Sequence, residues 1–344
     1  SYMNIGLDIG DTGIKLVELY KRGDTLQLGT YAEEMIGGYA GREAGEIAKL
    51  GEDKLRFAVK DIYKQSKAVS KNITVGLPMS ACQLLHITVP KAAETILDTV
   101  VPIEVRRYVN LPYSELSISY EKLPPHPHQK DDTINVLVLA AKQSSVDTMH
   151  RVVDNIAEEA EVIIEPGIFG TLRAIPIDKN KVTLIIDLGA TLTSVAFVYE
   201  GVLYGVESTM KGVYSITEHI RESLGMTFTE AELIKKEFGV LGSPNMPLLR
   251  DVAVFAARRV IDEVIHIRSR FETRYTTMCT EIWLTGGGAR TKGLQELFAQ
   301  ELGLEIKISR AFERVEIPKT LEENLLDISP SFSHAVGLAM SRLI

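Results

Sequence analysis

Features that would place the chain in a specialised class of protein are scarce in its sequence. Only two cysteines occur among 344 residues, Cys82 and Cys279, and both lie in apolar, strand-like stretches. We expect two buried, reduced thiols, because disulfide frameworks and zinc sites need more cysteines at regular spacings. His126 and His128 lie in the loop PPHPHQKDD without further metal ligands at suitable spacing, so a solvated hairpin loop is expected there rather than a metal site.

Long hydrophobic runs and a surplus of basic residues are also missing. No apolar run approaches the roughly 20 residues that cross a bilayer, and no signal peptide is recognisable at the start. The formal net charge is −8, and no basic stripe is present. We therefore expect no general affinity for nucleic acid or anionic lipid, no direct membrane insertion and a cytoplasmic location.

The composition is that of an ordinary globular protein, with 45% hydrophobic and 24% charged residues. A chain of 344 residues exceeds the size at which one hydrophobic core stops growing, so more than one domain is expected. Apolar alternation and helical spacing predict strands and helices in turn along the chain. The predicted strands are 4–10, 13–20, 28–36, 72–78, 82–90, 115–123, 134–142, 161–167, 182–205, 281–289 and 304–308, and the predicted helices are 52–66, 93–109, 143–157, 167–174, 291–301, several within 211–275, and one from His334.

One pattern occurs twice in the sequence. NIGLDIGDTGIKLVEL (4–19) and VTLIIDLGATLTSVAFVYEGVLYG (182–205) each contain an apolar strand, an aspartate, a glycine turn and a second strand. A repeat of a whole unit indicates duplicated architecture, so we expect two α/β halves that each begin with such a hairpin. Between them, residues 82–160 read as strand–helix–strand–strand–helix, which predicts a small inserted α+β module.

Three glycine turns carry the candidate chemistry. Glycine lets the backbone approach an anion, and successive N–H groups in such turns form anion-binding nests. Asp8 and Asp187 each end a strand beside a turn, where paired carboxylates hold Mg²⁺, often through its water shell. Lys15 would meet a phosphate as a point charge. The turns are Asp8-Ile9-Gly10-Asp11-Thr12-Gly13, Asp187-Leu188-Gly189-Ala190-Thr191-Leu192-Thr193 and Thr285-Gly286-Gly287-Gly288-Ala289.

Each turn alone is equally consistent with an ordinary strand end, and Lys15 alone with an exposed strand residue. The ordered combination resembles the actin-like ATPase superfamily: LDIGDTGIK its first phosphate loop, IIDLGATLTSVAF its second, and IWLTGGGARTKGL its adenosine motif. EPGIFGTLRA (165–174) and SHAVGLAM (333–340) are similar to its two hinge helices, and EAELIKKEFG (230–239) to its nucleotide-side helix.

This resemblance implies a two-lobed α/β fold, built on a duplicated ribonuclease H-like unit, with ATP and Mg²⁺ in the cleft. It implies a first lobe of 1–81 plus 161–181, an inserted module of 82–160, a second lobe of 182–332 with a helical subdomain at 211–275, and a final helix, 333–344, that crosses back at the hinge. It further implies Asp8 and Asp187 as metal-holding residues. The implied nucleotide-binding residues are Asp8, Gly10, Asp11, Thr12, Gly13, Lys15, Asp187, Gly189, Ala190, Thr191, Glu232, Lys235, Gly286, Gly287, Gly288 and Ala289.

Two positions depart from the superfamily pattern. Asp11 lies where relatives more often place a serine or threonine facing the terminal phosphate, and a carboxylate there opposes the anion by like charge. Either Asp11 turns outward and Thr12 takes the contact, or Mg²⁺ compensates for the charge. Ala190 replaces a glycine found in many relatives. Glu165, at the start of the connecting helix, is the candidate for positioning the attacking water; the alternative is that it caps this helix. The resemblance implies at most slow ATP turnover, with nucleotide acting as a conformational switch.

Within the superfamily, a small module at this place in the chain is typical of the cell-division protein family FtsA and the pilus-assembly family PilM, and the chain resembles these two families. EVRRYVNLPYSELSISYEKL (104–123) is similar to the PilM version of the module. FtsA proteins carry a further amphipathic membrane helix, which we do not recognise here, so PilM is favoured. The PilM resemblance implies a scaffold of type IV pilus or related type II secretion assembly, recruited to the inner membrane by the cytoplasmic tail of a PilN-like protein. An FtsA-like division protein and a small-molecule kinase remain alternatives, and self-association is left open.

Overall fold

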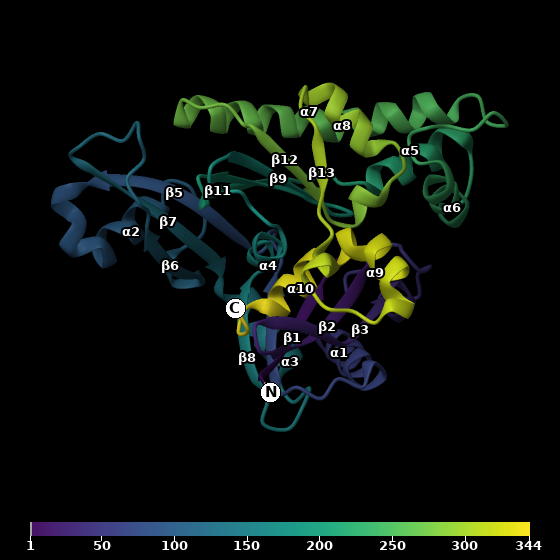
Figure 1. Cartoon of the computed structure of the whole chain (residues 1–344), viewed down its shortest axis with the longest axis horizontal. Helices are drawn as coiled ribbons and strands as arrows, with labels where there is room; N and C mark the ends of the chain where they lie inside the picture. Colours follow the sequence, from purple (N-terminus) through teal and green to yellow (C-terminus); the bar gives the residue numbers. More distant parts are fainter. Residues whose placement is uncertain (1) are drawn as a thin grey trace.

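The computed structural model describes residues 2–344 and contains two β-sheets. The first sheet has five strands in the order β3-β2-β1-β4-β8. β1 pairs antiparallel with β2 and parallel with β4, and β4 pairs parallel with β8. This sheet is the centre of the first lobe (Figure 1). Its strands are β1 (Tyr2–Ile9), β2 (Gly13–Arg22), β3 (Thr25–Met35), β4 (Asn72–Leu77) and β8 (Glu161–Pro166).

The second sheet has eight strands in the order β13-β12-β9-β10-β11-β5-β7-β6. Its first five strands belong to the second lobe and its last three to the inserted module. The two parts join where Val206 of β11 pairs with Leu84 of β5, so the module extends the second-lobe sheet. The strands are β5 (Cys82–Pro90), β6 (Leu116–Lys122), β7 (Thr133–Lys142), β9 (Val182–Leu188), β10 (Thr193–Tyr199), β11 (Val202–Thr209), β12 (Glu281–Thr285) and β13 (Ile306–Ile308).

Helices cover both sheets, and most lie where the sequence predicts them. The predicted helix at 93–109 is shorter in the structure, because Lys91–Ile96 forms a 3₁₀ turn and the α-helix ends at Val105. The α-helices are α1 (Glu52–Ser66), α2 (Leu97–Val105), α3 (Gln143–Val153), α4 (Gly167–Ala174), α5 (Tyr214–Leu224), α6 (Phe228–Phe238), α7 (Leu249–Tyr275), α8 (Leu294–Leu302), α9 (Glu322–Ile328) and α10 (Ser333–Met340). The 3₁₀ turns are η1 (Gly37–Ala40), η2 (Lys91–Ile96), η3 (Tyr113–Glu115), η4 (Gly287–Arg290), η5 (Ala311–Arg314), η6 (Lys319–Leu321) and η7 (Ser329–Phe332).

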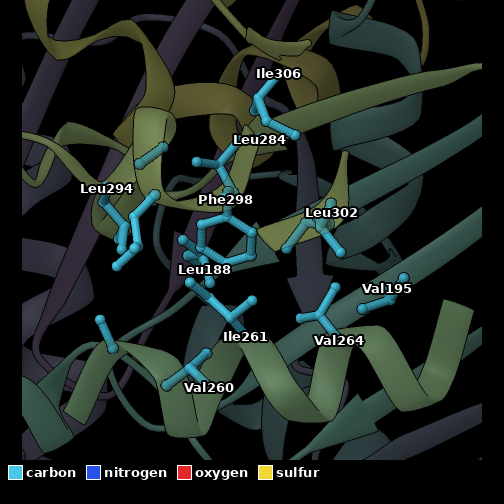
Figure 2. Close-up of a cluster of buried hydrophobic side chains, with 14 of the residues drawn as sticks. Leu188, Val195, Val260, Ile261, Val264, Leu284, Leu294, Phe298, Leu302 and Ile306 are labelled. Atoms are coloured by element: carbon cyan, nitrogen blue, oxygen red, sulfur yellow. The ribbon is translucent and has the colours of Figure 1, made fainter. Parts of the chain in front are cut away.

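The largest core lies between α7 and the second-lobe sheet. Val260, Ile261 and Val264 of α7 face Leu284 of β12 and Phe298 of α8 (Figure 2). The apolar 3–4 spacing within 252–271 is therefore that of a core helix.

The inserted segment divides between the two lobes. Strands β5, β6 and β7 continue the second-lobe sheet, whereas α3 packs against α1 and against β4 and β8 of the first lobe. Met149, Val152 and Val153 of α3 lie in the same hydrophobic core as the first-lobe strands. The predicted segment 82–160 thus adds its strands to the second-lobe sheet, whereas its last helix packs into the first-lobe core together with Cys82 of β5 and Ala141 of β7.

Two sequence expectations concern particular side chains. Both cysteines are free and buried. The expectation of a solvated loop is wrong for His126: this residue is 7% exposed, and its ring packs at 4.7 Å, centroid to centroid, from Tyr199. The apolar rings of the second lobe bury this histidine, whereas His128 stays exposed. Within residues 2–344 we find no helix with the length and apolar content that crossing a membrane requires.

Two helices, α4 and α10, lie between the lobes and pack against each other (Figure 1). Their backbones meet at Gly170 and Gly337, where a β-carbon on Gly337 would lie 1.6 Å from the carbonyl oxygen of Gly170. α10 also lies against β1, where a β-carbon on Gly6 would lie 1.9 Å from the carbonyl oxygen of Ala335. Glycine is therefore required for this contact, which fixes the crossing of the chain between the lobes.

Candidate functional site between the two lobes

The two aspartate-containing hairpins have the same backbone geometry. In the first turn, residues 10–13, the Gly10 N–H donates to the Gly13 carbonyl at 2.9 Å. In the second turn, residues 189–192, the Gly189 N–H donates to the Leu192 carbonyl, also at 2.9 Å. The repeat found in the sequence is therefore a structural repeat, and it places Asp11 and Ala190 at equivalent positions.

Asp8 and Asp187, which precede the two turns, converge on one side chain of the hinge helix α10. His334 Nε2 lies 2.5 Å from Asp187 Oδ2, and His334 Nδ1 lies 3.6 Å from Asp8 Oδ1. Burial opposes a charged imidazole, but the charges and hydrogen bonds of Asp187 and Asp8 outweigh it and hold the pKa of His334 well above its usual value. Burial likewise favours a neutral Asp8, yet His334 and the charge of Lys15 together outweigh it and lower the pKa of Asp8. His334 thus contacts one aspartate of each lobe.

The tips of the two turns also contact each other. The Thr191 hydroxyl donates a hydrogen bond to Asp11 Oδ2 across the boundary between the lobes. The Thr12 carbonyl accepts a hydrogen bond from the Ile36 N–H at 3.1 Å, which ties the first turn to its own lobe. Lys15 lies opposite Asp8 in the β1–β2 register, and its amine lies 3.7 Å from a carboxylate oxygen of Glu33.

The triglycine turn lies against the end of β9. Thr285 is in register with Asp187 across the parallel β12–β9 pair, and Gly286 follows with φ of 85°. A β-carbon on Gly286 would lie 2.5 Å from Asp187 Oδ1, and one on Gly288 would lie 2.8 Å from Leu188 Cβ. Gly287 and the buried Ala289 continue this segment in η4. The second and third predicted motifs therefore form one continuous surface in the second lobe.

Glu232 and Lys235, predicted to contact adenosine, form a closed set of contacts with α5. Lys235 Nζ lies 2.9 Å from Glu232 Oε2 and 2.7 Å from the Thr217 hydroxyl, which in turn donates to Glu232 at 2.7 Å. The chain that follows α6 contacts the segment that follows η4, because the Val240 N–H donates to the Lys292 carbonyl at 2.9 Å. The side chains of Glu232 and Lys235 are engaged with each other.

Glu165 lies near the carboxyl end of β8, at the same end of the sheet as Asp8 on β1. The two residues are in register with Gly76 of the intervening strand β4. The Glu165 carboxylate is held by the Arg173 guanidinium, with Nη2 2.8 Å from Oε2, and Arg173 Nη1 also lies 3.3 Å from the Gly337 carbonyl. Glu165 thus forms an ion pair that connects β8 with the hinge helices.

Comparison with known proteins agrees with this arrangement. The sequence profile of the family described as type IV pilus assembly protein PilM matches residues 6–343. The chain belongs to the PilM family.

Solved structures share the fold of this PilM-family chain. A PilM–PilN type IV pilus biogenesis complex is 23% identical, with 98% of this chain and 97% of that chain covered and a TM-score of 0.82. The ethanolamine utilization protein EutJ from Carboxydothermus hydrogenoformans is 14% identical, covering 99% and 90% with a TM-score of 0.57. MreB5 of Spiroplasma citri, bound to ADP, is 13% identical, covering 99% and 97% with a TM-score of 0.57. The fold is therefore the predicted two-lobed, actin-like one.

The carboxylate oxygens at this site match the cation that the family fold implies. Mg²⁺ prefers carboxylate oxygens and water, and Asp8 and Asp187 present such oxygens from opposite lobes. In this PilM-family chain, however, His334 already contacts both carboxylates.

Sequence reasoning did not find His334. It lies in SHAVGLAM, which was noted for its small residues, and its partner Asp187 is 147 positions away. A polar, ionisable residue within an otherwise small and apolar hinge helix was the available signal.

Proposed function

We propose that this PilM-family chain is a nucleotide-responsive scaffold of type IV pilus, or related type II secretion, assembly. It binds ATP with Mg²⁺ between its lobes and holds the cytoplasmic tail of a PilN-like membrane protein, which recruits it to the inner face of the inner membrane. The observation that carries the proposal is the family match together with two equivalent aspartate hairpins that meet across the hinge.

Nucleotide binding is supported by the placement of the glycine turns. The second turn and the triglycine turn lie side by side in the second lobe, and the first turn faces them from the first lobe. Backbone N–H groups of such turns bind phosphate oxygens. A ligand gripped by both lobes favours the closed arrangement by the difference in its affinity for the two states. Turnover is at most slow in this proposal, and Glu165 is the candidate that positions water once Arg173 releases it.

The metal assignment predicts the effect of two substitutions. Asp8→Ala and Asp187→Ala are each expected to weaken ATP binding in the presence of Mg²⁺ by roughly 10- to 100-fold, because each removes a charged ligand. Calorimetric titration with and without Mg²⁺ measures this. Asp24→Ala, an exposed aspartate in the β2–β3 turn, is the matched control and is expected to bind as the wild type does.

Unchanged ATP affinity in both Asp8→Ala and Asp187→Ala would remove the metal assignment. The same proteins allow Glu165 to be tested, since Glu165→Gln removes a charged acceptor and keeps the shape. Equal rates of phosphate release from the wild type and Glu165→Gln would exclude its role in positioning water.

The free edge of β8 is the proposed place for the PilN-like tail. β8 ends the first-lobe sheet, and extended peptides bind such edges by adding a strand. The Glu161 N–H donates to Lys71 of the chain leading into β4, so by alternation the N–H groups of Val162 and Ile164 point to the free edge. The side chains of Val162 and Ile164 pack against the first-lobe core, so the side chain of Ile163 lies on the other face of the sheet. Ile163 is 42% exposed and offers apolar surface to the same peptide.

Strand addition at β8 predicts a specific result for proline. Val162→Pro removes an outward N–H, whereas Val162→Ala removes similar side-chain packing and keeps the N–H. We expect Val162→Pro to weaken binding of a fluorescent PilN-tail peptide at least roughly tenfold, and Val162→Ala to change it less than about threefold. Fluorescence anisotropy measures both. Equal affinities for the two variants would place the peptide elsewhere.

A further inference from the structure

The contact between the two turn tips places an exposed carboxylate at the boundary between the lobes. Asp11 occupies the tip of the first turn, and its Oδ2 accepts a hydrogen bond from the Thr191 hydroxyl of the second turn. The equivalent position of the second turn is the uncharged Ala190. The two lobes are therefore joined at this point by an anion that belongs to the protein itself.

Within residues 2–344, the Asp11 carboxylate forms no ion pair with a lysine, arginine or histidine. Three carboxylates, Asp8, Asp11 and Asp187, lie at the turns. His334 pairs with Asp187 and Asp8, and Lys15 lies opposite Asp8 in the β1–β2 register and 3.7 Å from Glu33. Asp11 is exposed, so a phosphate that approaches it is opposed by a like charge that water partly screens.

The direction of a bound nucleotide determines which phosphate meets Asp11. The triglycine turn, proposed for the nucleoside, lies against Asp187 and Leu188 in the second lobe. A phosphate chain that starts there and reaches the first turn extends toward the first lobe. The phosphate farthest from the nucleoside is therefore the one that comes next to Asp11.

We infer that Asp11 determines nucleotide specificity: its carboxylate joins the turns in the nucleotide-free chain and opposes a third phosphate, so a nucleoside diphosphate binds more tightly than a triphosphate. This inference rests on the proposed nucleotide site. Asp11 acts as a competitor that a triphosphate must displace from Thr191, whereas a diphosphate leaves the Asp11–Thr191 contact in place.

Binding measurements on charge variants test the inference. ADP and ATP are titrated, each with Mg²⁺, into the wild type, Asp11→Asn and Asp11→Ser. Asparagine keeps an oxygen that accepts from Thr191 but loses the charge, and serine loses both the charge and the reach. We expect the wild type to favour ADP by roughly tenfold or more, and both variants to gain ATP affinity by a similar factor with little change for ADP. Asp24→Asn is the control for a charge change outside the candidate site.

The outcomes separate this inference from the proposed function. An unchanged ATP-to-ADP affinity ratio in both Asp11 variants overturns the inference and leaves the nucleotide site standing, as does a wild type that favours ATP. Failure of all three proteins to bind either nucleotide overturns both. A measurement without nucleotide tests the Asp11–Thr191 contact independently, with one spin label on each lobe. Asp11→Ala and Thr191→Val should each broaden the distribution of distances between the two labels. An unchanged distribution would contradict the proposed contact.

Discussion

A β-carbon at position 337 is expected to disrupt the packing between the two lobes. In Gly337→Ala the new methyl group would lie 1.6 Å from the carbonyl oxygen and 2.7 Å from the Cα of Gly170. Both are backbone atoms, so no side chain can rotate away, and α4 and α10 must separate. We expect the free energy of unfolding to fall by more than about 4 kcal/mol, beyond the range of ordinary overpacking in a core.

Urea denaturation followed by circular dichroism measures this loss, with soluble yield as a second readout. Gly38→Ala is the matched control, because position 38 is exposed and a β-carbon there meets nothing within 4 Å. Its unfolding free energy should stay within about 0.5 kcal/mol of the wild type. An equally small change in Gly337→Ala would show that the helices do not cross at this pair of glycines.

Acidification is expected to destabilise the protein through His86. This side chain of β5 is 7% exposed, its ring stacks on Tyr275 at 5.4 Å between centroids, and its Nδ1 is hydrogen-bonded to the Tyr275 hydroxyl. Burial, and then the charge of the neighbouring Arg274, lower the pKa of His86 to about 4. His126 adds a smaller repulsion, while Asn135 acts in the opposite direction.

The sign of the effect follows from the unfolded chain, in which histidine has an ordinary pKa of about 6.5. The unfolded state binds the proton more tightly than the folded state, so stability is fully present above pH 6.5 and is lost as the pH falls toward 4. The shift of His86 corresponds to about 3 kcal/mol over this interval. Denaturation at pH 7.5, 5.5 and 4.5 measures the loss.

Two substitutions isolate the contribution of His86. His86→Gln removes the titrating group, so its stability should depend on pH less steeply than that of the wild type between pH 6.5 and 4.5. His150→Gln, an exposed histidine on α3, should retain the wild-type slope. Equal slopes for His86→Gln and the wild type would assign the acid sensitivity to other groups.

The sequence predicted those features that depend on neighbours along the chain. The two hairpins were recognisable because strand, aspartate and glycine turn are contiguous, and α1 and α4 lie at their predicted bounds. The pairing of β11 with β5 was not predictable. It rests on Val206 and Leu84, which are distant in the sequence, and no hydrophobic periodicity indicates which two strands will pair.

Side chains that act across the fold were harder to foresee. The burial of His126 depends on rings supplied by β10, β11 and the end of α7. The pairing of His334 with two aspartates depends on how α10 crosses between the lobes. Such contacts arise only when tertiary packing brings distant segments together.

The continuous sheet from β13 to β6 has a mechanical consequence. It joins the inserted strands to the second-lobe sheet, while α3 and β8 pack with the first lobe, so the inserted segment connects the two lobes. A peptide bound at β8 that also contacts the inserted strands would set the angle between the two lobes. A second ligand that changes the same angle must then alter the affinity for the peptide. Because linked binding equilibria are reciprocal, the peptide alters the affinity for that ligand by the same factor.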